Sequence, residues 1–303
     1  MSAIPGTLAR YTKDVHGEAA GQEWLDHLPA ILADHAARWS LTLQPPFPNL
    51  TYNYAAPAVR ADGTPVVIKA GFIPPDKEFV SEANALRIFV GRGAVRLLED
   101  DLDQGVLLLE RLEPGTPLCA LEDDEEAIAA AASVLRQLWR PVPPQHGFPL
   151  TSDWGRGFAR LRAHFGGTGP FPAALVERAE RLFAELTTTQ AAPALLHGDL
   201  NFGNVLAAQR EPWLAIDPKG VVGEPAYDTG IFLRDPLPDI LNVPDPARLL
   251  ARRIDQLAEE LNFDRERIRN WGLAQAVLSA WWSVEDHGAG WEPALACAEL
   301  LAQ

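Results

Sequence analysis

The residues with the clearest capacity for chemistry lie near the middle of the chain. Residues 195–206 read LLHGDLNFGNVL, and an Ile-Asp-Pro run follows at residues 216–218. Asp199 and Asn204 are five positions apart, and Asp217 closes the next apolar run. Carboxylate and amide oxygens are the ligands that Mg²⁺ takes in proteins, and a further carboxylate can accept a proton from a hydroxyl. These residue types therefore suit the transfer of a charged group whose charge a metal ion neutralises.

The order and spacing of the three residues match the catalytic loop of kinases. In that arrangement Asp199 is the catalytic residue facing the acceptor hydroxyl, and Asn204 and Asp217 are the metal ligands. A polar turn between two buried strands also uses Asp and Asn, so any one of the three alone would be read as a turn former. Together, and with His197 and Gly198 preceding Asp199, they favour phosphoryl transfer.

The same segment resembles the aminoglycoside phosphotransferase superfamily, relatives of protein kinases that usually carry His-Gly-Asp at this place. Residues 213–228, WLAIDPKGVVGEPAYD, resemble the branch that contains streptomycin 6-phosphotransferase and hydroxyurea phosphotransferase. The resemblance implies ATP and Mg²⁺ as cofactors and a hydroxyl of a small molecule as the acceptor. It also implies that His197 holds the loop and is not the base.

An apolar run at residues 66–69 ends in Lys69, which fits the kinase strand whose lysine contacts the nucleotide phosphates. A lysine at a strand end is also commonly just solvated, but the downstream motif favours the binding role. Its expected partner is a glutamate on the next helix. Glu82 is the first choice because its surroundings resemble the family segment, and Glu78, one turn earlier, is the rival.

The loop expected to cover the nucleotide departs from the protein-kinase pattern. No glycine occurs between Asn49 and Pro57, where kinases use a glycine-rich loop. Thr51, Tyr52 and Asn53 are the candidates for nucleotide contacts in its place. The family resemblance further places the adenine-binding backbone at Glu110 to Leu112.

The elements around these residues predict an α+β, protein-kinase-like bilobal fold with an extra N-terminal helical segment. The expected domains are residues 1–110, an N-lobe with an N-terminal helix and an antiparallel nucleotide-binding sheet, and residues 111–303, a mainly helical C-lobe with the catalytic loop and the substrate site. Asp62-Gly63 is a hairpin signal between two strand-like runs. Residues 141–172 are rich in glycine and proline and allow no assignment.

Composition narrows the classes of partner. The formal net charge is -15, which disfavours nucleic acid and anionic membrane surfaces and suits a cationic small substrate, although acidity also simply keeps proteins soluble. No stretch reaches the length of a membrane span, so a cytoplasmic protein is expected. Cys119 and Cys297 are not closely spaced and are expected to be buried free thiols. The oligomeric state, the hydroxyl modified and the choice of ATP or GTP do not follow from the sequence.

Within the resembled branch, a streptomycin-type aminoglycoside is the leading substrate and hydroxyurea the second. Guanidinium groups of such an acceptor need carboxylates, and the candidates are Glu224, Asp228, Glu285 and Asp286. A plain surface charge is the more ordinary interpretation of each. A metabolic kinase for choline, a sugar or an amino-acid alcohol would share every motif. A non-catalytic nucleotide-binding protein is a further alternative, and only the glycine-free loop supports it.

Overall fold

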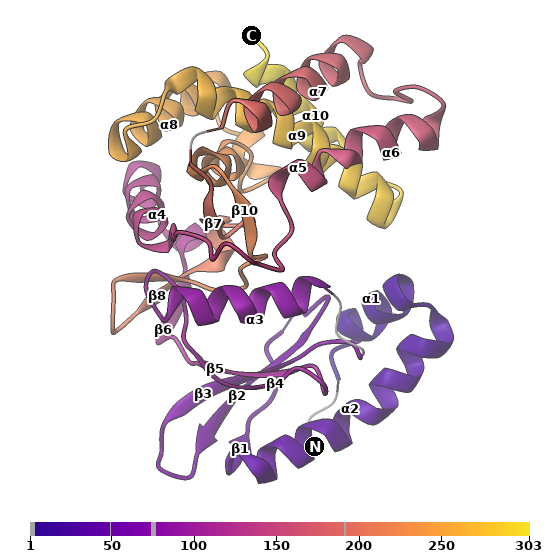
Figure 1. Cartoon of the computed structure of the whole chain (residues 1–303), viewed down its shortest axis with the longest axis vertical. Helices are drawn as coiled ribbons and strands as arrows, with labels where there is room; N and C mark the ends of the chain where they lie inside the picture. The colour runs from indigo at the N-terminus through magenta and orange to yellow at the C-terminus, as the bar shows by residue number, and fades with distance from the viewer. Residues whose placement is uncertain (1–3, 49, 74–76, 191) are drawn as a thin grey trace. The chain divides into compact units, whose positions relative to one another are not determined.

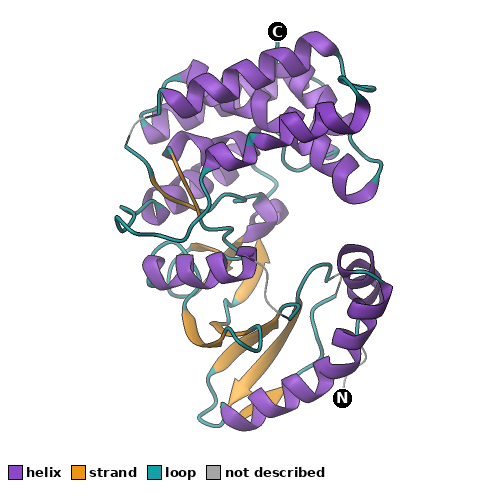
Figure 2. Ribbon diagram, turned by 45° about the vertical axis from the view of Figure 1, so that its right-hand side comes forward, coloured by secondary structure: helices purple, strands orange, loops and turns teal. Residues whose placement is uncertain are grey.

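The computed structural model describes residues 4–48, 50–73, 77–190 and 192–303. It divides into two compact units, Met1–Gly115 and Thr116–Gln303 (Figure 1). The division follows residue 115, whereas the sequence suggested a boundary after residue 110. The first unit is rich in strands and the second in helices, as Figure 2 shows, and this is the α+β architecture expected from the sequence.

The first unit is built on a five-stranded antiparallel sheet in the order β1-β2-β3-β5-β4. Gly63 has φ +86° and closes the turn between β2 and β3, since its N–H donates to the carbonyl of Arg60 at 2.9 Å. The strands are β1 (Leu41–Leu43), β2 (Tyr54–Arg60), β3 (Pro65–Ala70), β4 (Leu97–Asp101) and β5 (Val106–Glu110). The Asp-Gly hairpin predicted from the sequence is confirmed.

Two N-terminal helices, α1 (Gly6–His16) and α2 (Glu18–Arg38), add to this sheet. Leu8 and Leu28 from the helices and Ala56 and Ile68 from the strands belong to one buried cluster. Burial of this apolar surface is what attaches the helical segment to the sheet. A third helix, α3 (Lys77–Phe89), follows β3 and carries the two candidate glutamates.

The second unit contains short strands that frame the chemical motifs. One sheet has the order β6-β8-β9, and β7 pairs with β10 in an antiparallel pair. The bounds are β6 (Pro114–Pro117), which spans the division between the units, β7 (Ala194–Leu196), β8 (Val205–Ala208), β9 (Trp213–Ala215) and β10 (Val221–Gly223). Asp199 therefore lies in the connection from β7 to β8, and Asp217 lies in the connection from β9 to β10.

Helices make up most of the second unit. The α-helices are α4 (Asp124–Leu138), α5 (Thr151–Trp154), α6 (Arg156–Phe165), α7 (Ala173–Thr188), α8 (Pro246–Leu261), α9 (Arg265–His287) and α10 (Glu292–Leu301), and the 3-10 helices are η1 (Leu118–Ala120), η2 (Phe202–Asn204), η3 (Pro225–Leu233) and η4 (Asp239–Leu241). Helices α5 and α6 lie in the segment that the sequence left unassigned. In the described part of the chain, no helix is both long and apolar enough to cross a membrane.

The two cysteines differ in exposure. Cys297 is buried in α10, and its thiol donates to the carbonyl of Leu233 at 2.9 Å. Cys119 is exposed, so the expectation of a buried thiol is wrong there. In the short helix η1 the buried position is taken by Leu118, and Cys119 follows it at an exposed position.

Candidate active site

The loop after β7 is organised by its own asparagines. Asn201 caps the short helix η2, because its Oδ1 accepts from the N–H groups of Gly203 at 2.9 Å and Asn204 at 3.1 Å. The Asn204 amide nitrogen Nδ2 donates to the carbonyl of Asp199 at 2.8 Å. A carbonyl oxygen only accepts, so this bond identifies which end of the amide is nitrogen. The Oδ1 atom of Asn204 is then the end that can act as an oxygen ligand.

Asp217 lies in a turn that is bonded to the same loop on both sides. The N–H of Ile216 donates to the carbonyl of Asn204 at 2.9 Å, and the N–H of Lys219 donates to the carbonyl of His197 at 2.8 Å. Asp217 itself has φ +56°, a left-handed conformation that Asp tolerates better than most residues. The second unit thus joins the segments of Asp199, Asn204 and Asp217 in one hydrogen-bonded framework.

His197 is a fully buried part of this framework. Its Nε2 lies 2.8 Å from the carbonyl of Ile216, and its Nδ1 accepts from the N–H of Asp199 at 3.2 Å. Both contacts are satisfied by a neutral ring with the proton on Nε2. Burial lowers the pKa of His197 to about 4, against the opposing influence of the Ile216 carbonyl and of Asp217. A neutral ring with both nitrogens engaged fits the loop-holding role and not that of a base.

Asp228, in η3, holds the same loop by accepting hydrogen bonds from its backbone N–H groups. Its Oδ1 accepts from the N–H of Gly198 at 2.9 Å, and its Oδ2 accepts from the N–H of His197 and the indole N–H of Trp139, both at 3.1 Å. The carboxyl is buried, and this burial raises its pKa to about 6 although the three hydrogen bonds act in the opposite direction. The sequence left its role open, and nothing local identifies it as a support for residues 30 positions earlier.

Two of the acidic residues suggested for the substrate are used inside the fold. Glu224 is buried, accepts from Arg267 Nε at 2.7 Å and also accepts from the indole N–H of Trp271. Asp228 is bonded to the backbone of the loop that carries Asp199, as described. Glu224 and Asp228 are therefore neither the surface charges that the sequence suggested nor placed to pair with an acceptor guanidinium, because both are desolvated and already hydrogen-bonded. Glu285 and Asp286 lie at the C-terminal end of α9.

In the first unit, Lys69 and Glu82 form a buried ion pair. The Lys69 Nζ atom donates to both carboxylate oxygens of Glu82, at 2.7 and 2.8 Å, and each side chain is 6% exposed. Glu78 is exposed in the first turn of α3. The structure therefore pairs Lys69 with Glu82, the first choice from the sequence. Buried pairs are weak evidence for stability, since desolvation opposes their attraction, and a kinase uses such a glutamate to hold the lysine that contacts phosphates.

The glycine-free loop precedes β2. The ring of Tyr52, which is 49% exposed, lies 5.9 Å from the ring of Tyr11 in α1, measured between centroids. Asn53 lies beside Gly71, because a Cβ atom on that glycine would come within 3.0 Å of the Asn53 Oδ1 atom. Thr51 is half-buried at the start of this loop. Asn49, which bounds the segment considered in the sequence, lies outside the described residues.

The segment proposed for adenine begins where β5 ends. The N–H of Glu110 donates to the carbonyl of Arg96 at 2.9 Å, and the Glu110 carboxylate accepts from the N–H of Arg96 at 3.1 Å. Leu112 is buried. The Glu110 side chain therefore bonds the residue that precedes β4, and the backbone of residues 110–112 stays the candidate for contact with the base.

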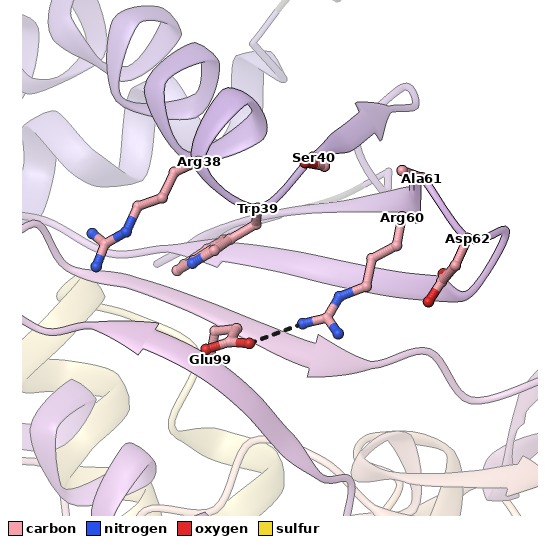
Figure 3. Close-up of a pocket in the computed structure, with 7 residues that line it drawn as sticks. All are labelled: Arg38, Trp39, Ser40, Arg60, Ala61, Asp62 and Glu99. Atoms are coloured by element: carbon pink, nitrogen blue, oxygen red, sulfur yellow. Dashed lines mark hydrogen bonds and ion pairs between the residues drawn. The ribbon is translucent and has the colours of Figure 1, made fainter.

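A pocket of about 380 Å³ also lies in the first unit, between the end of α2, the β2–β3 turn and β4 (Figure 3). Its two arginines are paired, since Arg60 bonds Glu99 at 3.2 Å and Arg38 bonds Asp101 at 2.6 Å. None of the predicted site residues lines this pocket, whose lining is Arg38, Trp39, Ser40, Arg60, Ala61, Asp62 and Glu99. It is therefore separate from the candidate active site.

The candidate oxygen ligands in the second unit, Asn204 and Asp217, suit Mg²⁺ better than metal ions that protein side chains coordinate completely. Among the described residues, no group of three His, Cys, Asp or Glu side chains is placed to hold a metal ion. Mg²⁺ is usually held by one or two carboxylates together with phosphate oxygens and water. The Asp217 carboxylate and the Asn204 amide oxygen fit that pattern.

Comparison with known proteins gives the same picture over nearly the whole chain. A family model described as aminoglycoside/hydroxyurea antibiotic resistance kinase matches residues 38–287. Streptomycin 6-kinase from Streptomyces glaucescens is 35% identical, over 99% of this chain and 96% of the relative. Hydroxyurea phosphotransferase from Kitasatospora aureofaciens is 38% identical, over 89% of this chain and 77% of the relative.

Solved structures share the fold at lower identity. An aminoglycoside phosphotransferase, APH(4)-Ia, solved in a ternary complex with ADP and hygromycin B, matches with a TM-score of 0.61 and 16% identity, over 89% of this chain and 96% of that chain. The match confirms the fold expected from the sequence. The family match spans most of the chain and includes the whole hydrogen-bonded framework around Asp199. This chain therefore belongs to the aminoglycoside/hydroxyurea antibiotic resistance kinase family.

Proposed function

We propose that this protein transfers the γ-phosphate of ATP to a hydroxyl of a streptomycin-type aminoglycoside. The observation that carries the proposal is the 35% identity to a streptomycin 6-kinase over 99% of this chain, in a molecule whose Asp199, Asn204 and Asp217 segments form one framework. The use of ATP is supported by the family and by the ADP bound in a phosphotransferase of the same fold. Dependence on ATP also favours the cytoplasm as the place of action.

In this proposal Lys69 binds the nucleotide phosphates, and Glu82 holds its ammonium group in position. Charge-assisted hydrogen bonds of this kind are stronger than neutral ones. Thr51, Tyr52 and Asn53 contact the nucleotide from the glycine-free loop, and the backbone of residues 110–112 contacts the adenine. A backbone that lacks glycine is less free to approach phosphates closely, so side chains carry more of the contact here than in a glycine-rich loop.

Asp199 receives the proton of the acceptor hydroxyl as the bond to phosphorus forms. Its position is set through the backbone, since its N–H is bonded to His197 and its carbonyl to Asn204. Asn204 Oδ1 and the Asp217 carboxylate would hold Mg²⁺, which neutralises charge on the phosphates when it is bound. Most of the rate enhancement then comes from positioning and electrostatic stabilisation.

The acceptor is expected to be a cation. A formal net charge of -15 attracts cationic substrates over distances of about the Debye length, roughly 10 Å at 0.1 M salt. Streptomycin carries guanidinium groups and benefits from this field. The rate at subsaturating streptomycin should therefore fall as the salt concentration rises.

Hydroxyurea is the second candidate, because the 38% identity to a hydroxyurea phosphotransferase is at least as high as that to the streptomycin kinase. That match covers 77% of the relative and 89% of this chain, so it extends over less of both proteins. A small neutral acceptor would show little salt dependence. The salt dependence of the rate at subsaturating acceptor therefore distinguishes streptomycin from hydroxyurea.

The decisive experiment measures ADP release and product mass with streptomycin, other aminoglycosides, hydroxyurea and choline, each with and without Mg²⁺. We expect a mass increase of one phosphate on streptomycin that requires both ATP and Mg²⁺. An Asp217→Asn variant, which keeps size but loses charge, is the control and should give little product while remaining folded. Product with choline or hydroxyurea and none with any aminoglycoside would overturn the substrate assignment.

A further inference from the structure

A tryptophan lies directly against the backbone that precedes Asp199. Trp154 is the last residue of the short helix α5. A Cβ atom built on Gly198 would come within 2.9 Å of the Trp154 Cη2 atom and within 2.9 Å of a Val221 methyl carbon. Gly198 also has φ +86°, so this position needs glycine for two reasons. The indole of Trp154 thus packs against the residue that precedes the proposed catalytic Asp199.

Trp154 continues into a row of aromatic rings. Its ring centroid lies 5.6 Å from that of Tyr227, which is buried, and 6.2 Å from that of Trp282 in α9 with an interplanar angle of 82°. Trp154 and Trp282 are only half-buried. The first ring of the row, Trp154, therefore packs on Gly198, and the indoles of Trp154 and Trp282 both keep part of their surface exposed to solvent.

The neighbouring tryptophans of α9 show what a purely structural indole looks like in this helix. Trp271 and Trp281 have exposures of 0% and 2% and pack edge-to-face, Trp271 on Phe183 and Trp281 on Phe165. Trp282 follows Trp281 directly but keeps part of its surface exposed. Core packing accounts for the first two rings and leaves the exposed surface of Trp282 unexplained.

The C-terminal end of α9 adds negative charge one turn beyond Trp282. Glu285 forms a two-point ion pair with Arg160 of α6, at 2.5 and 2.9 Å. Asp286 follows it in the last turn of α9 and is exposed. Arg160 is attracted by both of these adjacent carboxylates. Acidic groups still outnumber the basic one among Arg160, Glu285 and Asp286, which suits a cation.

We propose that Trp154 and Trp282 form an aromatic wall of the acceptor site, on which the cationic groups of the acceptor stack. The inference rests on the proposed function, because it concerns the same acceptor. Guanidinium groups are planar, weakly hydrated and stack on indole faces, and such contacts contribute about 0.5 to 2 kcal/mol. Glu285 and Asp286 supply the long-range attraction at the far end of the wall. Hydroxyurea is small and neutral, so the aromatic wall and these carboxylates would add little to its binding.

The test compares Trp282→Leu, which removes the aromatic face but keeps an apolar side chain, with Trp282→Phe, which keeps a smaller aromatic face. Trp154→Phe probes the ring against Gly198, and Trp291→Ala is the matched control, since Trp291 is half-buried in the same unit but contacts Phe171. Streptomycin binding is measured by calorimetry without nucleotide, alongside ADP binding and the thermal midpoint of each variant.

We expect Trp282→Leu to weaken streptomycin binding roughly 3- to 30-fold, Trp282→Phe to weaken it less, and Trp291→Ala to leave it unchanged, with ADP affinity constant throughout. Equal binding by Trp282→Leu and the wild type overturns the wall, and so does wild-type protein that does not bind streptomycin. Wild-type protein that binds streptomycin through these tryptophans without phosphorylating it supports the wall and contradicts the proposed function.

Discussion

The loop that carries Asp199 and the loop of residues 51–53 are held in place in different ways. Around Asp199, Asp228 and His197 are buried, and they bond backbone groups of Gly198 and Ile216, 30 and 19 positions away along the chain. In residues 51–53, the ring of Tyr52, which is about half exposed, lies 5.9 Å from that of a tyrosine of α1. The first loop is preorganised by desolvated hydrogen bonds, whereas the Tyr52 ring contact in the second lies at the surface.

This difference has a functional meaning. Proton acceptance and metal binding require atoms held close to a productive geometry, and buried hydrogen bonds in a low dielectric provide that rigidity. Contacts with a nucleotide can tolerate a loop that adapts when the ligand arrives. Substitutions around Asp199 should therefore affect turnover most, and substitutions around residues 51–53 should affect apparent nucleotide affinity modestly.

The largest effect is expected for Asp199→Ala. Loss of the proton acceptor should lower kcat by roughly 10² to 10⁴, while ADP affinity changes little because the phosphate contacts lie elsewhere. Steady-state kinetics with the accepted substrate and calorimetric ADP binding measure the two quantities. A variant that loses ADP binding but keeps turnover at saturating ATP would show that Asp199 serves the nucleotide.

The next largest effect is expected for Lys69→Ala. Removal of a charge-assisted phosphate contact should lower kcat/KM for ATP roughly 10- to 100-fold. The thermal midpoint should also fall, because Glu82 is left buried without its cation. Glu82→Gln should share the kinetic defect and Glu78→Gln should not, and unchanged ATP kinetics in Lys69→Ala would remove the lysine from the nucleotide site.

Protonation of His197 should link the rigid loop to the acid stability of the protein. The buried ring has a pKa of about 4, below the ordinary value near 6.5, so between these values the unfolded chain binds a proton that the folded chain does not. Acid therefore favours unfolding, and the stability due to the neutral ring is lost as the pH falls from about 6.5 to 4.

His197→Asn removes this titration while leaving that of Asp228 in place. The difference in unfolding free energy between wild type and variant should therefore shrink by roughly 3 kcal/mol between pH 6.5 and 4. Denaturant titrations at a series of pH values measure it. A difference that does not change with pH would mean that His197 is not held neutral in the folded protein.

Asp228→Asn should break the loop support without touching the reacting groups. An amide places N–H donors against the N–H groups of His197, Gly198 or Trp139, so at least one buried hydrogen bond is lost at a cost of about 1 to 3 kcal/mol. We expect a lower thermal midpoint and reduced kcat with a nearly unchanged KM for ATP. Wild-type stability in this variant would show that the carboxylate does not hold the loop.

The smallest effect is expected in the other loop. Tyr11→Ala removes the ring that contacts Tyr52, and aromatic pairs contribute about 0.5 to 1.5 kcal/mol beyond area burial. KM for ATP should rise roughly two- to tenfold with little change in kcat. An effect on kcat as large as that of Asp228→Asn would erase the contrast between the two loops.

Much of the site was predictable because its signals are local in the chain. The spacing of Asp199, Asn204 and Asp217 follows from one loop and the next turn, and Lys69 follows from the strand that precedes it. Resemblance to the family segment made Glu82 the first choice, and the structure pairs it with Lys69 through a 2.7 Å bond. The roles of these residues toward ATP and Mg²⁺ remain predictions.

The sequence by itself determined the family, the two-part α+β architecture and the order of the chemical groups, since these depend on residue type and short spacing. Only the tertiary structure decided that Glu224 and Asp228 are internal supports, that Cys119 is exposed, and that Trp154 lies against Gly198. A carboxylate or an indole looks the same in sequence whether it faces solvent or a buried N–H. Its role depends on which distant segments pack around it, because burial and hydrogen-bond partners are properties of the folded chain.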